Sequence, residues 1–366
     1  MIYFCYVLIA LLAIRLLIAL INYFSFAYLP QATTVSNQPT VSVLIPARNE
    51  ENTIGGLLEQ LSTFDYTPLE IIVYNDHSTD RTEPIVQDWV ARNSNMQLIN
   101  GGELPEGWLG KNHACHQLAK AATGAVLLFL DADVQVKKEV INRSIGHFQK
   151  YELHLLSLFP KQLMRSFGEK VSVPLMNWIL LSLLPLALIR TSRNKAFSAA
   201  NGQFMMFNAA TYKSLWPHEH FKLHQVEDIA ILKLFKQNNL ACDTLLGDND
   251  ISCRMYTGLD DAVEGFTKNI FEFFGSSQVL AVTFGLLTTI APFVIYAYMG
   301  IAWCTAYILG VLSVRFFVSL ASQQSVLQNL LLAFPQHLVF LLIITKGLIN
   351  KKRKQLLWKG RNIFQD

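Results

Sequence analysis

The chain begins and ends with long apolar runs, and apolar and polar residues alternate at shorter intervals between them. Residues 1–29 are apolar except for Arg15, Asn22 and small polar groups. About 20 helical residues cross a hydrocarbon core of about 30 Å, so this run predicts an N-terminal transmembrane anchor. No basic region precedes it and no small-residue cleavage site follows it, so we do not expect a cleaved signal peptide. Arg15 falls near mid-span, where a charge is costly; snorkelling, pairing with another helix and a shifted span all stay open.

Between residues 41 and 249 short apolar runs alternate with amphipathic segments. We expect strands at 41–45, 69–74, 96–99 and 125–130, and helices at 54–62, 80–91 and 110–122. The run from Ala125 to Leu130 has no polar alternation, which is typical of a strand buried on both faces of a parallel sheet. Strands and helices that alternate through short loops predict a doubly wound, mostly parallel α/β domain.

This domain is interrupted by residues 171–189, which carry no charge but include two prolines. The segment is long enough to span a bilayer, yet a crossing would place Asp228 on the opposite side of the membrane from Asp133. We therefore expect it to lie in the membrane interface, where Lys170 and Arg190 can meet anionic headgroups and a lipid can be admitted. A second interfacial region is expected over residues 250–275.

Three further apolar stretches, 278–299, 301–320 and 325–348, predict C-terminal transmembrane helices. The basic tail 349–366 follows them. Three complete crossings from a cytoplasmic domain would leave this tail outside, against the positive-inside rule. The stretch that contains Pro335 could instead be re-entrant, so the number of crossings stays open.

Composition supports a membrane protein. Of the 366 residues, 52% are hydrophobic and only 16% are charged, which is too apolar for an ordinary soluble enzyme. The net charge of +3 comes without a basic groove interleaved with aromatic residues, so nucleic acid is not an expected partner. The five cysteines are scattered and form no C-x-x-C pair, which predicts neither a disulfide framework nor a zinc site and fits a reducing cytoplasmic face.

Polar residues gather where the expected strands end. Arg48 and Glu50 follow the first strand, Asp76 the second, and Asp131 and Asp133 the fourth. Ligands of open α/β sheets bind beyond the carboxyl ends of the strands, so these side chains would line one crevice if the strands are neighbours. Residues two apart on an extended chain face the same side, so both aspartates can reach one hard cation or one ribose-phosphate. An isolated D-x-D is more often a solvated turn, but three successive strand-end clusters favour a site.

Two adjacent acids, Glu227 and Asp228, precede a helical pattern over residues 229–237. A pair of acids at a helix start is commonly structural, and the helix dipole would keep both ionised.

Histidines form two further groups. The first, His218, His220 and His224, lacks the spacing of a metal site, so we expect a solvated or acceptor-lining loop. The second, His113 and His116, is expected on the surface of its helix.

Five motifs occur in a fixed order: Ile45-Pro-Ala-Arg-Asn-Glu50, Asn75-Asp76-His-Ser-Thr-Asp80, Gly107-Trp-Leu-Gly-Lys-Asn112, Asp131-Ala-Asp133 and Val226-Glu-Asp228. In this order they resemble the inverting family-2 glycosyltransferases, which have the GT-A fold. Three more segments, Arg254-Met-Tyr256, Glu264-Gly-Phe-Thr-Lys-Asn269 and Trp358-Lys-Gly-Arg361, extend the resemblance over essentially the whole chain. They make it most similar to membrane-bound enzymes that glycosylate lipids, such as the carotenoid (diaponeurosporenoate) and hopanoid-associated glycosyltransferases.

The resemblance implies a nucleotide-sugar site with a divalent cation. Lys111 would lie near the nucleotide and Asp131 near the ribose, and Asp133 would ligate Mg²⁺ or Mn²⁺ on the diphosphate. Four residues would surround the base and ribose: Pro46, Arg48, Glu50 and Asp76.

The resemblance also implies a catalytic and an acceptor side. Asp228 matches the catalytic base, with Glu227 beside it, and Gly202 would allow the backbone to approach the sugar closely. Three residues would belong to the acceptor side or the membrane interface: Arg254, Glu264 and Lys268.

The implied activity is transfer of a single sugar from a nucleotide-sugar donor, with UDP-hexose expected, to a membrane lipid such as a carotenoid, a hopanoid or another glycolipid precursor. The cell membrane would hold the chain by several spans, with the catalytic domain cytoplasmic. The Q-x-x-R-W motif of processive synthases is absent, because no tryptophan follows an arginine. A second departure is Asp76-His77, where the family commonly has Asp-Gly. A processive polysaccharide synthase and a non-catalytic membrane scaffold remain the alternatives.

Overall fold

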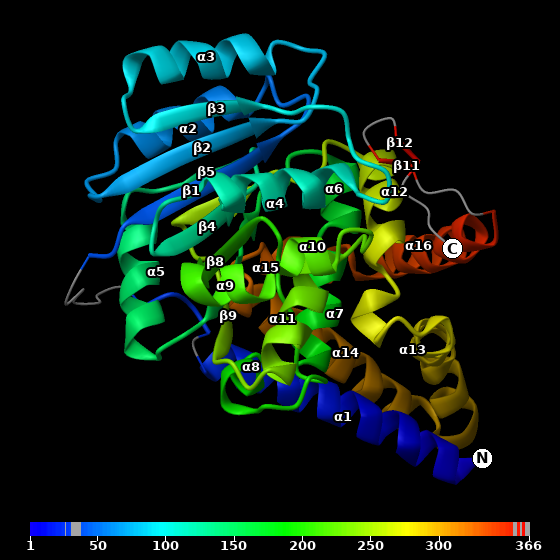
Figure 1. Cartoon of the computed structure of the whole chain (residues 1–366). Helices are drawn as coiled ribbons and strands as arrows, with labels where there is room; N and C mark the ends of the chain where they lie inside the picture. Colours follow the sequence, from blue (N-terminus) through cyan, green and yellow to red (C-terminus); the bar gives the residue numbers. More distant parts are fainter. Residues whose placement is uncertain (26, 31–37, 354–356, 359–360, 363–366) are drawn as a thin grey trace. The chain divides into compact units, whose positions relative to one another are not determined.

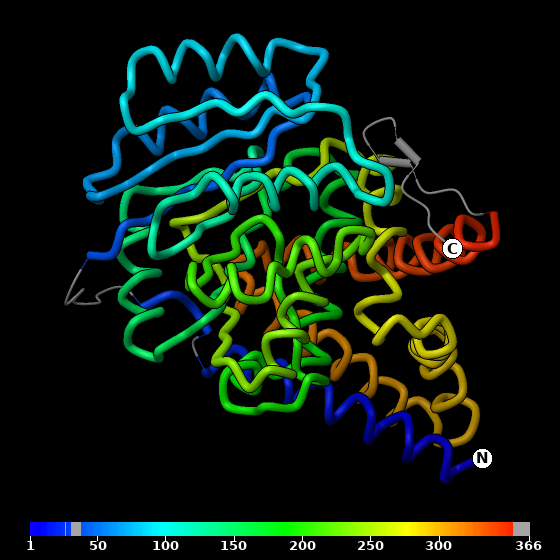
Figure 2. The backbone as a smooth tube through the Cα atoms, in the orientation of Figure 1, coloured from blue at the N-terminus to red at the C-terminus, as the bar shows by residue number. Residues whose placement is uncertain are grey.

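The computed structural model describes residues 1–25, 27–30, 38–353, 357–358 and 361–362. The chain divides into two compact units. A helical unit comprises Met1–Ala27, Gln162–Leu188 and Met255–Asp366, and a sheet unit comprises Tyr28–Lys161 and Ile189–Arg254. The backbone therefore passes between the units several times, as the colours along the tube in Figure 2 allow the reader to follow.

The sheet unit is built on seven strands in the order β3-β2-β1-β4-β8-β6-β9 (Figure 1). All neighbours are parallel except β8, which runs antiparallel to β4 and β6. The predicted mostly parallel sheet is thus confirmed, with one reversed strand. The strands are β1 Val41–Ala47, β2 Leu69–Asn75, β3 Met96–Asn100, β4 Val126–Leu130, β6 Leu155–Phe159, β8 Phe204–Asn208 and β9 Cys242–Leu246. A small second sheet pairs β5 Val134–Val136 with β10 Ile251–Cys253, and β7 Lys161–Gln162 follows at the unit boundary.

Helices cover both faces of the large sheet. Alternate residues of β1 pack in one hydrophobic cluster with the buried residues of α2, α3 and α5. The buried residues of α4 lie outside this cluster although α4 contacts β1 and β2, so α4 covers the other face. The prediction of a doubly wound domain is therefore confirmed. The helices are α2 Ile54–Ser62, α3 Thr82–Arg92, α4 Gly110–Ala121, α5 Glu139–Lys150, α8 Ala187–Thr191, α9 Ala209–Leu215, α10 Pro217–His220 and α11 Glu227–Gln237.

Within the residues that the structure describes, the helical unit contains four helices that are long and apolar enough to cross a membrane: α1 Ile2–Phe24, α13 Gln278–Met299, α14 Ile301–Ala321 and α16 Ala333–Arg353. The predicted apolar helices at both ends of the chain are confirmed. The third C-terminal stretch is broken into α15 Val326–Leu331 and α16, so the number of crossings stays a prediction. Half of the basic tail, including Lys354, and the centre of the Trp358–Arg361 motif lie outside the described residues. The remaining elements are α6 Phe167–Ser172, α7 Pro174–Leu183, α12 Leu259–Asn269, the 3₁₀ helix η1 Glu272–Phe274, β11 Leu357–Trp358 and β12 Arg361–Asn362.

Residues 171–189 do not form one continuous helix. Pro174 occupies the first position of α7, where a missing N–H is harmless, and Pro185 follows the end of this helix. Nine of the ten residues of α7 are buried, and the helix contacts α1, α14 and α16. The segment therefore packs within the helical unit, although it interrupts the sheet unit in sequence, and its position in a membrane interface stays a prediction.

Asn22 fastens α1 to the end of α7. Its Nδ2 donates to the carbonyl oxygens of Leu181 at 2.9 Å and Leu184 at 2.8 Å, and its Oδ1 accepts from the N–H of Leu186 at 2.8 Å. One buried amide thus satisfies three backbone groups that the C-terminus of α7 leaves without helical partners.

Replacing Asn22 by leucine should destabilise the helical unit by about 2 kcal/mol or more, because three buried backbone groups lose their partners. The melting temperature of the detergent-purified chain measures this. Asn238→Leu is the matched control, since Asn238 donates to the Leu234 carbonyl at the exposed end of α11 and should change stability little. Equal losses in both variants would contradict this account of Asn22.

Candidate functional site

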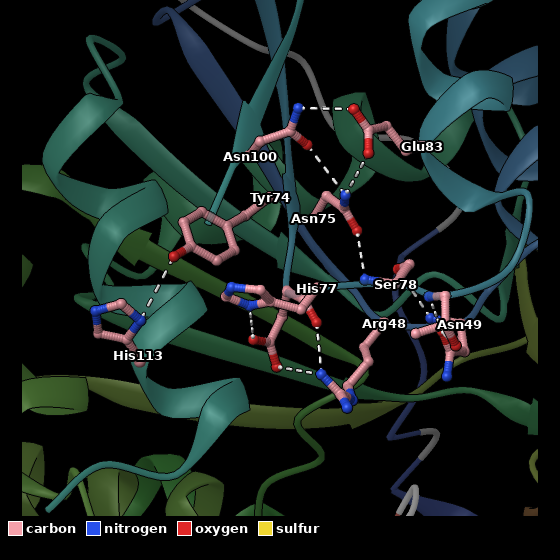
Figure 3. Close-up of polar contacts among 11 residues, drawn as sticks. Arg48, Asn49, Tyr74, Asn75, His77, Ser78, Glu83, Asn100 and His113 are labelled. Carbon is pink, nitrogen blue, oxygen red and sulfur yellow. Dashed lines mark hydrogen bonds and ion pairs between the residues drawn. The ribbon is translucent and has the colours of Figure 1, made fainter. Parts of the chain in front are cut away.

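The strand ends that carry polar residues are neighbours in the sheet. The parallel register pairs Pro46 with Tyr74 and Ala47 with Asn75, so the segments that leave β1 and β2 run side by side. Arg48 Nη1 donates to the Asp76 carbonyl at 2.7 Å and lies 3.8 Å from Asp76 Oδ2 (Figure 3). The structure thus brings Pro46, Arg48 and Asp76 together at one edge, as expected.

Side-chain hydrogen bonds fix these two loops to each other. Asn49 Oδ1 accepts from the N–H of Thr79 at 2.8 Å, and the N–H of Glu50 donates to Thr82 Oγ1 at 2.7 Å. Asn49 and His77 have φ angles of +54° and +53°, in the left-handed region that favours glycine and tolerates asparagine. His77 stands where the family commonly has glycine, so the loop keeps a turn that needs positive φ without that residue.

Lys111 lies between a carboxylate at the end of β4 and a carboxylate at the start of α11. Lys111, in the first turn of α4, places Nζ 2.8 Å and 2.9 Å from the two Asp131 carboxylate oxygens. Glu227 Oε1 lies 3.8 Å from the same nitrogen. Burial alone would lower the pKa of Lys111, but the carboxylates of Asp131 and Glu227 outweigh it and raise this pKa. Lys111 therefore stays charged at any pH at which the protein functions.

Asp133 offers a carboxylate suited to a cation. Burial, followed by the charges of Asp131 and Glu50, raises the pKa of Asp133 to about 6. Its buried Oδ1 has no hydrogen-bond partner within the described part of the chain. The Asp133 side chain does form a hydrogen bond with the thiol of Cys253. The sulfur of Cys253 also accepts from Gln203 Nε2 at 2.9 Å. A desolvated carboxylate with a free oxygen fits a hard divalent cation.

The protein alone does not complete a metal shell. No cluster of three or more histidine, cysteine, aspartate or glutamate side chains suited to a metal occurs among the described residues. Mg²⁺ is often held by one or two carboxylates together with phosphate oxygens and water, so Asp133 suffices as the protein ligand of such an ion.

Asp228 lies in the first turn of α11. Its Oδ2 accepts from the N–H of Gly202 at 3.0 Å, and its Oδ1 accepts from the N–H of Ile229 at 2.7 Å. Burial and then the charge of Glu227 raise the pKa of Asp228 to about 7, although these hydrogen bonds and Lys111 oppose the rise. The expectation that the helix dipole keeps Asp228 fully ionised is therefore wrong, because desolvation outweighs it.

Gly202 lies at the centre of this cluster. A Cβ atom there would come within 3.3 Å of Lys111 Nζ, 3.6 Å of Glu227 Oε1 and 3.8 Å of Asp228 Cβ. Only a residue without a side chain leaves this space free and lets the three charged groups face one another. Gly202 reaches the site because β8 is reversed: its first residue, Phe204, pairs with Leu130 at the carboxyl end of β4.

The three residues expected on the acceptor side lie in different parts of the chain. Arg254 is the last residue of the sheet unit and follows β10, whereas Glu264 and Lys268 belong to α12 of the helical unit. Burial lowers the pKa of Lys268 to about 8. Their assignment to an acceptor site stays a prediction.

Three histidines lie in other surroundings than expected. His218 is buried against the Tyr212 hydroxyl, and burial lowers its pKa to about 3, so it belongs to the core and not to a solvated loop. His113 and His116 are also buried, with ring centroids 5.4 Å and 5.2 Å from Trp108. The expected surface placement of this pair is wrong, because Trp108 covers their face of α4.

Sequence reasoning missed the contact of Cys253 with Asp133 and the hydrogen bond from Gln203 to Cys253. The only sequence signal was their place beside singled-out residues, Gln203 after Gly202 and Cys253 before Arg254. Neither residue type in isolation indicates a site.

Comparison with known proteins agrees with this geometry. Residues 42–172 match the family model described as Glycosyl transferase family 2. The chain is 30% identical over 235 residues to the 4,4'-diaponeurosporenoate glycosyltransferase of Staphylococcus haemolyticus strain JCSC1435, covering 63% of this chain and 61% of that protein. The enzyme of the same name from Staphylococcus aureus strain USA300 is 29% identical over 238 residues, covering 64% and 61%. The chain thus spans about three fifths of the length of these curated relatives.

Among solved structures, the chain is similar to the mannosyltransferase PcManGT from Pyrobaculum calidifontis, determined in complex with GDP-Man and Mn²⁺. The TM-score is 0.59 at 16% identity, over 95% of this chain and 99% of that one, so the likeness concerns the fold. Residues 42–172 thus match a glycosyl transferase family 2 domain, and the fold of the chain is similar to that of a solved mannosyltransferase, which agrees with the resemblance seen in the sequence motifs.

The contact between Cys253 and Asp133 generates a prediction about cation binding. Cys253→Ala should weaken Mn²⁺ binding about ten-fold, because Asp133 loses the group that orients it. Titration of Mn²⁺ followed by electron paramagnetic resonance, with a nucleoside diphosphate present, measures this. Cys242→Ala is the matched control, since Cys242 is buried in β9 and donates to the Leu240 carbonyl. An unchanged affinity in Cys253→Ala would remove this role.

Proposed function

We propose that the chain is an inverting glycosyltransferase that moves one sugar from a nucleotide-sugar donor to a hydroxyl or carboxyl group of a membrane lipid. The observation that carries this proposal is Asp228, a carboxylate whose pKa of about 7 suits a general base, beside the Lys111, Asp131 and Asp133 cluster. The family of the domain and the names of the relatives support the same class of reaction.

The donor would occupy the carboxyl edge of β1, β2 and β4. Arg48, Glu50 and Asp76 would contact the base and ribose with Pro46 beneath them, and Lys111 and Asp131 would lie near the sugar-nucleotide linkage. A divalent cation held by Asp133, Mg²⁺ or Mn²⁺, would neutralise charge on the departing diphosphate. UDP-hexose is the donor that we propose, and the GDP-Man bound to PcManGT makes a GDP-sugar the first alternative to test.

Catalysis would rest on Asp228. In its ionised form it would take the proton of an acceptor hydroxyl as the oxygen attacks the anomeric carbon from the face opposite the diphosphate, which inverts that centre. An acceptor carboxylate would need no such proton transfer, and Asp228 would then orient the attacking oxygen. Glu227 and Lys111 would keep the base in place, and Gly202 would leave room for the sugar.

The acceptor would be a lipid. The four long apolar helices support a chain held in a membrane, and the relatives named for diaponeurosporenoate support a carotenoid or similar lipid as acceptor. We propose that the sheet unit faces the cytoplasm, and that Arg254, Glu264 and Lys268 contact the acceptor or the lipid headgroups.

Asp228→Asn should reduce sugar transfer by about 10² to 10⁴-fold, because the amide cannot accept the proton. Release of nucleoside diphosphate by the detergent-purified chain measures this, with a panel of UDP- and GDP-sugars, Mn²⁺ or Mg²⁺, and a host lipid extract. Asp88→Asn makes the same chemical change on the exposed face of α3 and should leave the rate unchanged. The absence of release from every donor by the unmodified chain would contradict the proposal and favour a scaffold, and long products would favour a polysaccharide synthase.

With a hydroxyl acceptor, the rate should depend on pH through Asp228. This carboxylate is protonated, and inactive as a base, below its pKa of about 7, so the rate should rise through pH 7 and level off above it. Lys111→Met should move the midpoint upward, because the lysine charge lowers the pKa of Asp228. Initial rates between pH 5 and pH 9 test both statements. A midpoint near pH 4, or one that Lys111→Met leaves in place, would contradict them.

A further inference from the structure

Two buried arginines of the helical unit share one tryptophan. Arg15 of α1 and Arg315 of α14 are 8% and 4% exposed. Their guanidinium carbons lie 4.8 Å and 5.0 Å from the ring centroid of Trp178 on α7. Arg15 also lies 4.8 Å from the centroid of Phe284. Of the alternatives that the sequence left open for Arg15, the structure favours packing against another helix, and it adds a second arginine at the same place.

The partners of this arginine pair are neutral. Arg15 donates to Ser182 Oγ from Nε at 3.3 Å and from Nη2 at 3.0 Å, and Arg315 Nη1 donates to Gln336 Oε1. Gln336 is held with its oxygen toward the arginine, because its nitrogen donates to the Lys170 carbonyl at 2.9 Å and to Asn329 Oδ1 at 3.0 Å. These contacts use some of the guanidinium N–H groups and leave Nη1 of Arg15 and Nε and Nη2 of Arg315 without a protein acceptor in the described chain.

Among the described residues, no carboxylate contacts either arginine. Neither arginine forms an ion pair with any of the described residues, although ion pairs such as Lys111–Asp131 and Arg143–Asp248 occur elsewhere in that part of the chain. Cation–π contacts offset part of the cost of burying two like charges, but a desolvated pair of cations normally has an anionic partner.

The location of both arginines in apolar helices limits the kinds of anion that can bind them. Both arginines lie inside helices long and apolar enough to cross a bilayer, where charged side chains are rare and commonly mark a binding site or a pathway. This location favours an anion that reaches them from the lipid phase. A guanidinium group binds phosphate and carboxylate oxygens through paired N–H donors, and it keeps its charge in an apolar setting.

We propose that Arg15 and Arg315, together with Trp178, which both contact, form a binding site for the anionic headgroup of a membrane lipid. The headgroup oxygens accept from the guanidinium N–H groups that Ser182 and Gln336 leave free, and the acyl chains lie along the apolar helices. This site is distinct from the nucleotide-sugar site of the sheet unit, and the proposal does not depend on the transferase activity.

The test measures how lipids change the melting temperature of the detergent-purified full chain. Phosphatidylglycerol should raise the melting temperature of the unmodified protein by several degrees in a saturable way, and zwitterionic phosphatidylcholine should not. Oleate, a carboxylate lipid, and inorganic phosphate are tested beside them. A shift with phosphatidylglycerol alone identifies a phosphate headgroup, and a shift with oleate identifies a carboxylate. A shift with inorganic phosphate equal to that with phosphatidylglycerol would overturn the lipid assignment.

The variants decide whether the arginine pair is responsible. Arg15→Gln with Arg315→Gln should abolish the lipid-dependent shift. Lys351→Gln with Lys352→Gln removes two charges from the exposed end of α16 and should retain it. A shift that persists in the arginine variant, that vanishes equally in the lysine variant, or that phosphatidylcholine reproduces would overturn the proposal.

A conservative variant covers the case in which the glutamines prevent folding. Arg15→Lys with Arg315→Lys keeps both charges but removes the planar donor forks, so the half-saturating phosphatidylglycerol concentration should rise about ten-fold. An unchanged half-saturating concentration would show that the guanidinium groups do not hold the lipid. Native mass spectrometry of the same samples counts the lipids retained, and this count does not require activity.

Discussion

The charge of Lys111 is the interaction on which the arrangement of the site depends. Acidic side chains from the end of β4 and the start of α11 converge in a partly buried space, where like charges repel more strongly than in water. Lys111 contacts Asp131 and Glu227 directly, and its charge also opposes the rise in the pKa of Asp133 and Asp228. The last two carboxylates lie outside its contact distance, so burial still raises their pKa. Lys111 thereby separates four carboxylates into two pairs. Asp131 and Glu227 have a direct counter-ion, whereas Asp133 and Asp228 can take a proton or a metal.

The fold delivers this cation and these acids by simple rules of sheet geometry. Parallel strands present their carboxyl ends at one edge, and the helices that follow begin there. The segment before β8 reaches the same edge because that strand is reversed, which places the backbone N–H of Gly202 against Asp228. A fully parallel sheet would have carried this segment to the opposite edge. The single antiparallel strand is therefore the topological feature that joins the acids of α11 to those of β4.

Much of this could be predicted from the sequence, because the signals are local. The spacing of Ile54, Leu57, Leu58 and Leu61 defines α2 to the residue, and the apolar run before Asp131 defines β4 within one residue. The ordered motifs gave the resemblance to family-2 glycosyltransferases and the candidate residues of the sheet edge. The burial of individual polar residues could not be predicted, because it depends on which side chains pack over them in the folded protein. His113 and His218 look like polar surface positions until Trp108 and Tyr212 are placed over them, and no sequence pattern predicts a thiol beside Asp133.

Residues 171–189 and Arg15 show the same limit in the helical unit. Judged by hydropathy alone, residues 171–189 are a candidate membrane crossing and Arg15 is a misplaced charge in an apolar span. The contact between them explains both features. The buried α7 brings Ser182 and Trp178 to Arg15, so the charge gains a hydrogen-bond acceptor and an aromatic face. Asp131 and Glu227 of the sheet unit have a counter-ion in Lys111, within the protein. The arginine pair has only neutral partners of this kind, so by the same electrostatic argument its counter-ion has to come from outside the described chain.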